Sequence, residues 1–145
     1  MNVLAVLIDT DVLLDFLTER GIFTKNAKGI VQKVAEKKIN AFLAAHSITN
    51  LFYILRKIYS VSERKQLLMA LCQSITIVEI GSGLIFNVFT NSNFDDIEDC
   101  LQAECALSVN ADYIITRNIN DYTHSGVPAI LPEELLKILK ASEKK

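Results

Sequence analysis

The chain has 145 residues, of which 50% are hydrophobic and 22% are charged, with five glycines, two prolines and no low-complexity segment. This composition is typical of one compact globular domain. Fifteen Lys and Arg residues against seventeen Asp and Glu residues give a formal net charge of -2, which excludes a global positive field for nucleic acid. A nucleic-acid partner would therefore have to be held by local contacts.

The first apolar run, residues 3–8, ends at Asp9 and is far shorter than the roughly 20 residues that span a bilayer. It also lacks a cationic lead-in and a small-residue cleavage site, so we predict neither a signal peptide nor a membrane-spanning segment. Three cysteines, Cys72, Cys100 and Cys105, lack paired metal-ligand spacing. We predict that they are reduced and mostly buried in a cytoplasmic protein.

Apolar, β-branched runs alternate with helical patterns along the chain. In chain order, the pattern predicts a strand over residues 3–8, a helix over 24–36, a strand over 39–44, helices over 48–59 and 60–72, a strand over 75–80, a helix over 97–109, strands over 113–116 and 127–131, and a helix over 132–140. Ser60 and Glu63 have the spacing of a capping box. The alternation predicts an α/β fold, with a parallel sheet covered by helices on both faces. Residues 1–140 form one predicted domain, and 141–145 a short polar tail.

Polar side chains follow two of the predicted strands. Those after residues 3–8 are Asp9 and Asp11, and those after residues 113–116 are Arg117, Asn118 and Asp121. Ligands of open α/β sheets bind outside the carboxyl ends of the strands, so we expect these residues at a site. Asp112 precedes its strand and is expected at the opposite edge.

A second group of acids, Asp95, Asp96, Glu98 and Asp99, opens the predicted helix over residues 97–109. Acidic side chains cap helix starts and complement the helix dipole, which is the structural explanation for one or two of them. Four acids in five residues exceed that need, because their mutual repulsion is costly unless a cation is nearby. We therefore predict a metal-related role for part of this cluster.

Together these acids suggest a site of oxygen ligands made by Asp9, by Asp96 or Asp99, and by Asp121. Carboxylate ligands without Cys or His select a hard ion, Mg2+ or Mn2+. Such an ion commonly completes its shell with substrate phosphate, which points to phosphate-ester chemistry. Arg117 or Asn118 would then meet the phosphate oxygens.

The chain resembles PIN-domain ribonucleases, of the kind found as VapC-type toxins, in four blocks: LIDTDVLLDFL, SITNLFYILRK, FDDIEDCLQAECA and ADYIITRNINDY. The blocks occur in the family's order, and the resemblance covers residues 3–132. It implies a Rossmann-like three-layer α/β/α sandwich, a Mg2+- or Mn2+-dependent endoribonuclease, an RNA substrate, a homodimer and an antitoxin partner. By position, Asp9, Asp99 and Asp121 match the family's metal-binding acids, and Asp96 matches an extra acid found in one branch.

Two positions depart from the family pattern. Asn50 stands where an acid is usual, so it is a candidate substrate contact, and Asp96 or Glu98 would have to supply the missing charge. Asp11 stands where Asn or Ser is commoner, and either joins the site or caps the following helix.

Two alternatives remain open at this point. A strand followed by Asp9, Thr10 and Asp11 also fits the first motif of a haloacid-dehalogenase-like phosphatase, and Thr116 fits its second motif. In that superfamily the metal-binding acids come after the Thr motif, whereas here the acidic cluster precedes Thr116, which argues against this alternative. The other alternative is a PIN-like binding module that has lost turnover, which Asn50 suggests.

We predict structural roles for several further residues. His46, which follows a strand, is expected to be hydrogen-bonded rather than catalytic. Ser47 is interpreted as a turn or cap residue, since no Ser-His-Asp pattern surrounds it. Core positions are expected at Leu84, Ile85, Val88 and Phe89.

Overall fold

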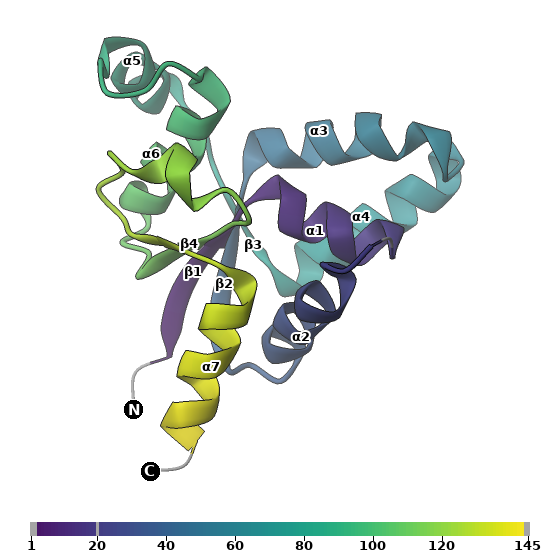
Figure 1. Ribbon diagram of the computed structural model, residues 1–145. Coiled ribbons are helices and arrows are strands. Elements are labelled where there is room, and N and C mark those ends of the chain that lie inside the picture. The colour runs from purple at the N-terminus through teal and green to yellow at the C-terminus, as the bar shows by residue number, and fades with distance from the viewer. Residues whose placement is uncertain (1–2, 20, 144–145) are drawn as a thin grey trace.

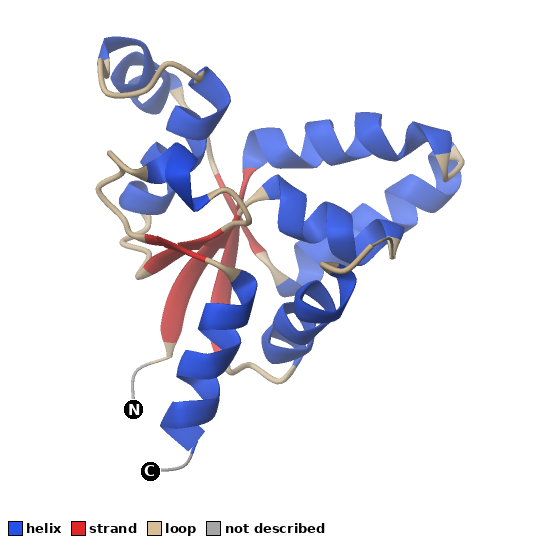
Figure 2. Cartoon of the chain, in the orientation of Figure 1, coloured by secondary structure: helices blue, strands red, loops and turns tan. Residues whose placement is uncertain are grey.

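The computed structural model describes residues 3–19 and 21–143. Within these residues, five strands form one parallel sheet in the order β3-β2-β1-β4-β5 (Figures 1 and 2). The strands are β1 (Leu4–Ile8), β2 (Ile39–Ala44), β3 (Thr76–Val78), β4 (Tyr113–Ile115) and β5 (Ala129–Ile130). Helices cover both faces, so the predicted three-layer α/β/α sandwich is confirmed.

Helices follow each strand of the sheet. They are α1 (Thr10–Thr18), α2 (Thr24–Ala35), α3 (Ala45–Ile54), α4 (Val61–Ser74), α5 (Ser82–Thr90), α6 (Ile97–Ser108) and α7 (Pro132–Glu143), with short 3-10 helices η1 (Leu55–Lys57) and η2 (Ile119–Tyr122). No helix in the described part of the chain is long and apolar enough to cross a membrane.

β1 lies in the middle of the sheet, between β2 and β4. Its residues Val6, Leu7 and Ile8 are fully buried, as expected for a parallel strand covered on both faces. Because Asp9 directly follows this strand, the fold delivers its carboxylate to the centre of the carboxyl edge.

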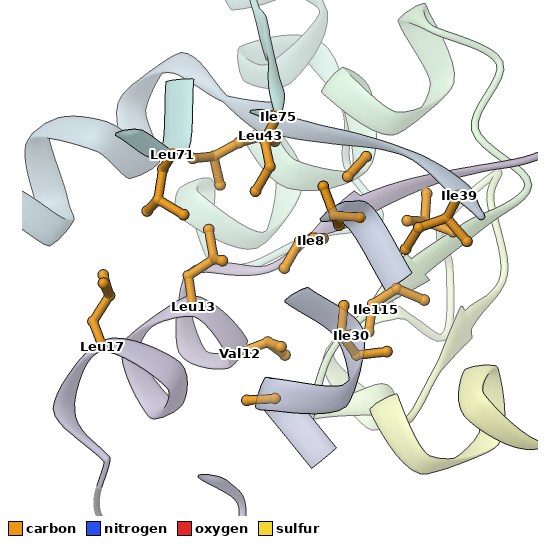
Figure 3. Packing of buried hydrophobic residues seen from close by; sticks show 14 of the residues in the cluster. Ile8, Val12, Leu13, Leu17, Ile30, Ile39, Leu43, Leu71, Ile75 and Ile115 are labelled. Atoms are coloured by element: carbon orange, nitrogen blue, oxygen red, sulfur yellow. The ribbon is translucent and has the colours of Figure 1, made fainter. Parts of the chain in front are cut away.

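Two buried clusters of apolar side chains lie on opposite faces of the sheet. Figure 3 shows the larger one, in which Ile8, Leu43 and Ile115 of the sheet lie among side chains from α1, α2 and α4. On the other face, Leu7 and Ile114 pack with residues of α6. Successive side chains of β1 therefore pack into different clusters on opposite faces of the sheet, which fixes the register of the central strand.

The ends of several elements differ from the predictions. The helix predicted over residues 48–59 begins earlier, at Ala45, and after Ile54 tightens into η1, while the predicted tail is helical as far as Glu143, with residues 144 and 145 outside the described part. The capping box is confirmed: Glu63 N donates to Ser60 Oγ over 3.1 Å, and Ser60 N donates to Glu63 Oε1 over 2.9 Å.

Two burial predictions are corrected. Cys100 and Cys105 are buried, but Cys72 is exposed and lies in an open groove between α3 and α4. The predicted core position Phe89 is wrong: its side chain is 67% exposed, and of the four apolar residues expected in the core of α5 only Val88 is fully buried. Helix α5 packs mainly on α6 rather than on the sheet, so only a narrow stripe of its side chains is buried.

Candidate functional site

Asp9 is the buried carboxylate at the centre of the site, with 8% exposure. Thr116 Oγ1 donates a hydrogen bond of 2.8 Å to Asp9 Oδ2, and Tyr122 Oη donates one of 3.2 Å to the same oxygen. Asn118 N in turn donates to Thr116 Oγ1 over 3.0 Å. The loop after β4 thus positions the carboxylate that follows β1.

The surroundings of Asp9 favour the protonated acid more than water does. Burial is the largest influence and raises its pKa, and the nearby charge of Asp11 raises it further. Hydrogen bonds from Thr116, Tyr122 and the backbone of Thr10 act in the opposite direction. The resulting pKa of Asp9 is about 6. A bound cation would stabilise the ionised form of this carboxylate.

Asp99, in the first turn of α6, is the second perturbed carboxylate. Its pKa is raised to about 7, first by partial burial and then by the charges of Asp96, Asp121, Asp9 and Glu98, in that order. These influences act at short range, so the acids from three chain segments gather at one edge of the sheet. The charges of Asp9, Asp96 and Asp121 therefore act on the carboxylate of Asp99, and a single site made by all four acids stays a prediction.

Asp96 and Asp9 both occupy helix N-cap positions, but they use their carboxylates differently. Asp96 Oδ1 accepts a hydrogen bond of 3.1 Å from Asp99 N, which is the capping role foreseen for part of the cluster. Asp9 makes no side-chain capping bond to α1. Its carboxylate is left to the loop after β4 and to the site.

The two asparagines of the candidate site each contact an acid. Asn50 Nδ2 donates to Glu98 Oε1 over 3.1 Å, so a carboxylate lies directly beside the position that is usually acidic in the family. Asn118 Nδ2 donates to Asp11 Oδ2 over 2.6 Å. The capping interpretation of Asp11 is wrong, since Asp9 occupies the N-cap position, and Asp11 instead joins the edge of the site.

Arg117 points to a second acid outside the cluster. Its Nε lies 2.8 Å from Asp15 Oδ2 of α1, and its guanidinium lies over the ring of Phe23, 4.2 Å from the centroid. Asp15 is almost fully buried, so this pair is well shielded from solvent. The positive charge of Arg117 is thus already paired with the carboxylate of Asp15. A role of Arg117 at the substrate phosphate stays a prediction.

A buried trio of polar side chains lies beneath the site, and sequence analysis missed it. Thr10 Oγ1 donates to Ser47 Oγ over 2.8 Å, and Gln102 Nε2 reaches Ser47 Oγ at 2.9 Å and Thr10 Oγ1 at 3.3 Å. These residues come from α1, α3 and α6, so the trio fixes three helices to one another. Ser47 is thus a core residue, not a turn or cap.

Thr116 and Tyr122 are the other site residues that the sequence did not single out as such. Tyr122 is 3% exposed, and burial together with the charges of Asp9, Asp99 and Asp11 raises its pKa, so the phenol stays protonated and donates. For Tyr122 the sequence signal was an aromatic residue one position after Asp121, and Thr116 was singled out only as the second motif of the phosphatase alternative.

His46 and Asp112 lie outside the acid cluster. His46 is not hydrogen-bonded as predicted: neither ring nitrogen has a partner among the described residues, and burial lowers its pKa, which keeps it neutral. Asp112 lies at the opposite edge, where its Oδ2 accepts a hydrogen bond of 2.8 Å from Ala5 N at the start of β1.

The donor set suits a hard divalent ion, because all the crowded side chains offer carboxylate oxygens. Among the described residues, no three His, Cys, Asp or Glu side chains already converge on one point. Mg2+ is often bound by one or two carboxylates and keeps several waters, so a site for it does not require three converging side chains. Asp9 and Asp99, with their raised pKa values, are the two carboxylates that would gain most.

The sequence pattern of the PIN domain family matches residues 5–120, which is most of the chain. The chain belongs to the PIN domain family. No curated protein matches this PIN domain in sequence. Family membership favours the PIN interpretation of the acids over the haloacid-dehalogenase-like one.

Solved structures share the fold of this PIN domain. VapBC-1 from nontypeable Haemophilus influenzae has a TM-score of 0.66 and 12% identity over 90% of this chain and 99% of that chain. VapBC2 from Rickettsia felis, solved with a DNA fragment from its promoter, has a TM-score of 0.66 and 13% identity over 88% of this chain and 98% of that chain. FitAcB from Neisseria gonorrhoeae has a TM-score of 0.63 and 13% identity over 88% of this chain and 98% of that chain. At such identities the likeness shows a common fold.

Proposed function

We propose that this PIN domain is a metal-dependent endoribonuclease that hydrolyses RNA phosphodiester bonds with Mg2+ or Mn2+. One observation carries the proposal: Asp9 and Asp99, from elements far apart in the sequence, both have raised pKa values, chiefly through burial, and repulsion by the charge of Asp9 adds to the increase at Asp99. A cation relieves that repulsion, and a PIN domain is the fold in which such acids serve a nuclease.

The side chains have distinct roles in this proposal. Asp9 and Asp99 would hold the ion, and Asp96 and Asp121 would contribute negative charge around it. Thr116 and Tyr122 keep Asp9 Oδ2 in place through their hydroxyl groups. When bound, the ion lowers the pKa of a coordinated water and neutralises charge on the phosphate.

Asn50 does not by itself argue for a binding module without turnover. An amide offers no charge to a cation, but Asn50 holds Glu98 within 3.1 Å, and Glu98 is among the charges that raise the pKa of Asp99. The missing negative charge is therefore supplied from α6 instead of α3.

The similarity to VapBC-1 and VapBC2 supports an antitoxin protein as a partner, and we propose that the chain is the toxin of such a pair. An apolar groove between α1, α2 and α4, which includes Phe16, Val31 and Leu67, offers this partner a surface. A homodimer and a cytoplasmic location complete the proposal.

Cleavage of single-stranded RNA by purified protein in Mg2+ or Mn2+ tests the proposal. Asp9→Asn and Asp99→Asn should each reduce cleavage by at least about 100-fold while the fold stays intact, because Asn keeps the size but removes the charge that holds the ion. Asp112→Asn is the matched control at the opposite edge and should cleave like the parent.

Three results would contradict the nuclease. Cleavage by Asp9→Asn at the parent's rate would exclude the proposed site. Folded wild-type protein without activity on RNA or on p-nitrophenyl phosphate would favour a binding module. Hydrolysis of p-nitrophenyl phosphate without RNA cleavage would favour a phosphatase.

A further inference from the structure

A cavity of about 240 Å3 lies between α1, α2, α7 and the loop after β4. Its walls come from the end of α1, the start of α2, the loop after β4 and the start of α7, and include Phe23, Asn26, Arg117, Asn118 and Glu133. Asn118 lines the cavity and also donates to Asp11 in the site. Asn118 thus connects the cavity to Asp11 at the edge of the site, and a ligand that reaches past Asn118 would contact both.

The charges around this cavity disfavour a phosphate. Among the described lining residues, Arg117 carries the one positive charge, and its Nε already lies 2.8 Å from the buried carboxylate of Asp15. Glu133 adds a negative charge. An anion would be repelled by Glu133 and would have to compete with Asp15 for the guanidinium, whereas a neutral polar ligand meets neither obstacle.

The shape and chemistry of the lining suit a flat, neutral ring with polar edges. The ring of Phe23 covers the guanidinium of Arg117 and is still 42% exposed, so part of it remains free to stack. Leu131 and Pro132 add apolar wall, while Asn26 and Glu133 supply hydrogen-bonding groups at the rim. Unpaired RNA bases are recognised by this combination, by stacking on aromatic or Arg planes and by hydrogen bonds to the base edge.

We propose that this cavity binds one unpaired nucleobase of the RNA, next to the phosphate held at the acid cluster, and so sets the sequence preference of cleavage. This inference rests on the proposed nuclease function. Glu133, when ionised, only accepts hydrogen bonds. It therefore favours a base that presents N–H donors on its edge, and Asn26 reads the remaining edge groups.

Binding of short RNAs that each lack one base tests the proposal without requiring cleavage. The probe is a fluorescein-labelled single-stranded RNA of about ten nucleotides, scanned with one abasic position at a time and measured by fluorescence anisotropy in Ca2+. One abasic position should weaken binding to the wild type by at least about fivefold, since stacking of one base contributes about 1–3 kcal/mol.

Phe23→Ala and Glu133→Gln should remove this sensitivity, so that the abasic and complete RNAs bind each variant within about twofold of each other. Phe86→Ala and Glu79→Gln are the matched controls: both residues are exposed, and they lie on α5 and after β3, away from the cavity. These controls should keep the wild-type scan, and thermal melts of all four variants confirm that they are folded.

The outcomes separate the two proposals. RNA cleavage together with a flat abasic scan, or a sensitive position that persists in both cavity variants, overturns the base-binding cavity and leaves the nuclease standing. A sensitive position that depends on Phe23 and Glu133, in a protein that does not cleave RNA, supports the cavity and overturns the nuclease. If no abasic position weakens RNA binding, the cavity does not bind a base, and a different occupant, such as a peptide, becomes the candidate.

Discussion

At the scale of single residues, Asp9 is held between opposing influences. Burial and Asp11 favour its protonated form, while the hydroxyls of Thr116 and Tyr122 stabilise its charge through the same oxygen, Oδ2. The longer bond, from Tyr122, is the one whose removal changes the charge balance without disturbing the loop that Thr116 supports. This makes Tyr122 a sensitive probe of how the protein tunes its site.

Tyr122→Phe should therefore raise the pKa of Asp9 further and weaken metal binding near neutral pH. We expect the Mn2+ concentration for half-maximal RNA cleavage to rise about three- to tenfold, which corresponds to the 0.5–1.5 kcal/mol typical of one hydrogen bond. The rate at saturating Mn2+ should change little. Tyr113→Phe, on β4, is the control, and an unchanged Mn2+ dependence in Tyr122→Phe would show that its hydroxyl does not support Asp9.

The sequence could predict which acids reach the site but not which neutral residues hold them. Asp9, Asp99 and Asp121 follow strands or begin helices, and the rules of parallel sheets place such positions at one edge. Tyr122 bonds to a residue 113 positions away, and Arg117 pairs with Asp15 in the wall of the cavity. Such contacts depend on side-chain directions in the folded loop after β4, which no local pattern encodes.

At the scale of elements, local signals predicted well wherever both ends of an interaction are close in the chain. The capping box of α4 is complete within four residues, and the limits of β2 agree with the prediction. Helix α5 had no such signal: it lacks a side-chain cap and exposes Phe86 and Phe89, so its apolar residues do not mark one buried face. Its position is set by contact with α6, a tertiary effect.

The start of α4 gives a prediction on stability. Ser60→Ala should lower the free energy of unfolding by about 1 kcal/mol, because the amide of Glu63 loses its hydrogen-bond acceptor. Urea denaturation at neutral pH measures this change. Ser62→Ala, inside the same first turn, should be neutral or slightly stabilising, since Ala is the better helix former. Equal losses in both variants would contradict the capping role.

At the scale of the whole molecule, the crowded acids link stability to pH and to metal. Asp9 and Asp99 have folded-state pKa values of about 6 and about 7, above the ordinary 3.8, so the folded protein binds more protons than the unfolded chain between these values. Their contribution is therefore fully present below about pH 4 and is lost as pH rises to about 7. For Asp9 the loss is about 3 kcal/mol.

Without metal, the melting temperature should fall between pH 5 and pH 8, and Asp9→Asn should flatten this fall. Millimolar Mn2+ should raise the melting temperature more at pH 8 than at pH 5, because an ion binds the deprotonated acids of the folded state. Differential scanning fluorimetry with Mn2+ or with EDTA provides the comparison. A melting temperature that ignores both Mn2+ and pH would argue against a competent metal site.

The trio of Thr10, Ser47 and Gln102 has a mechanical consequence for this edge. Gln102 lies one turn along α6 from Asp99, and its bonds tie this part of α6 to α1 and α3. An ion bound by Asp9 and Asp99 would add a further link between the start of α1 and the start of α6, two helices that the trio already joins.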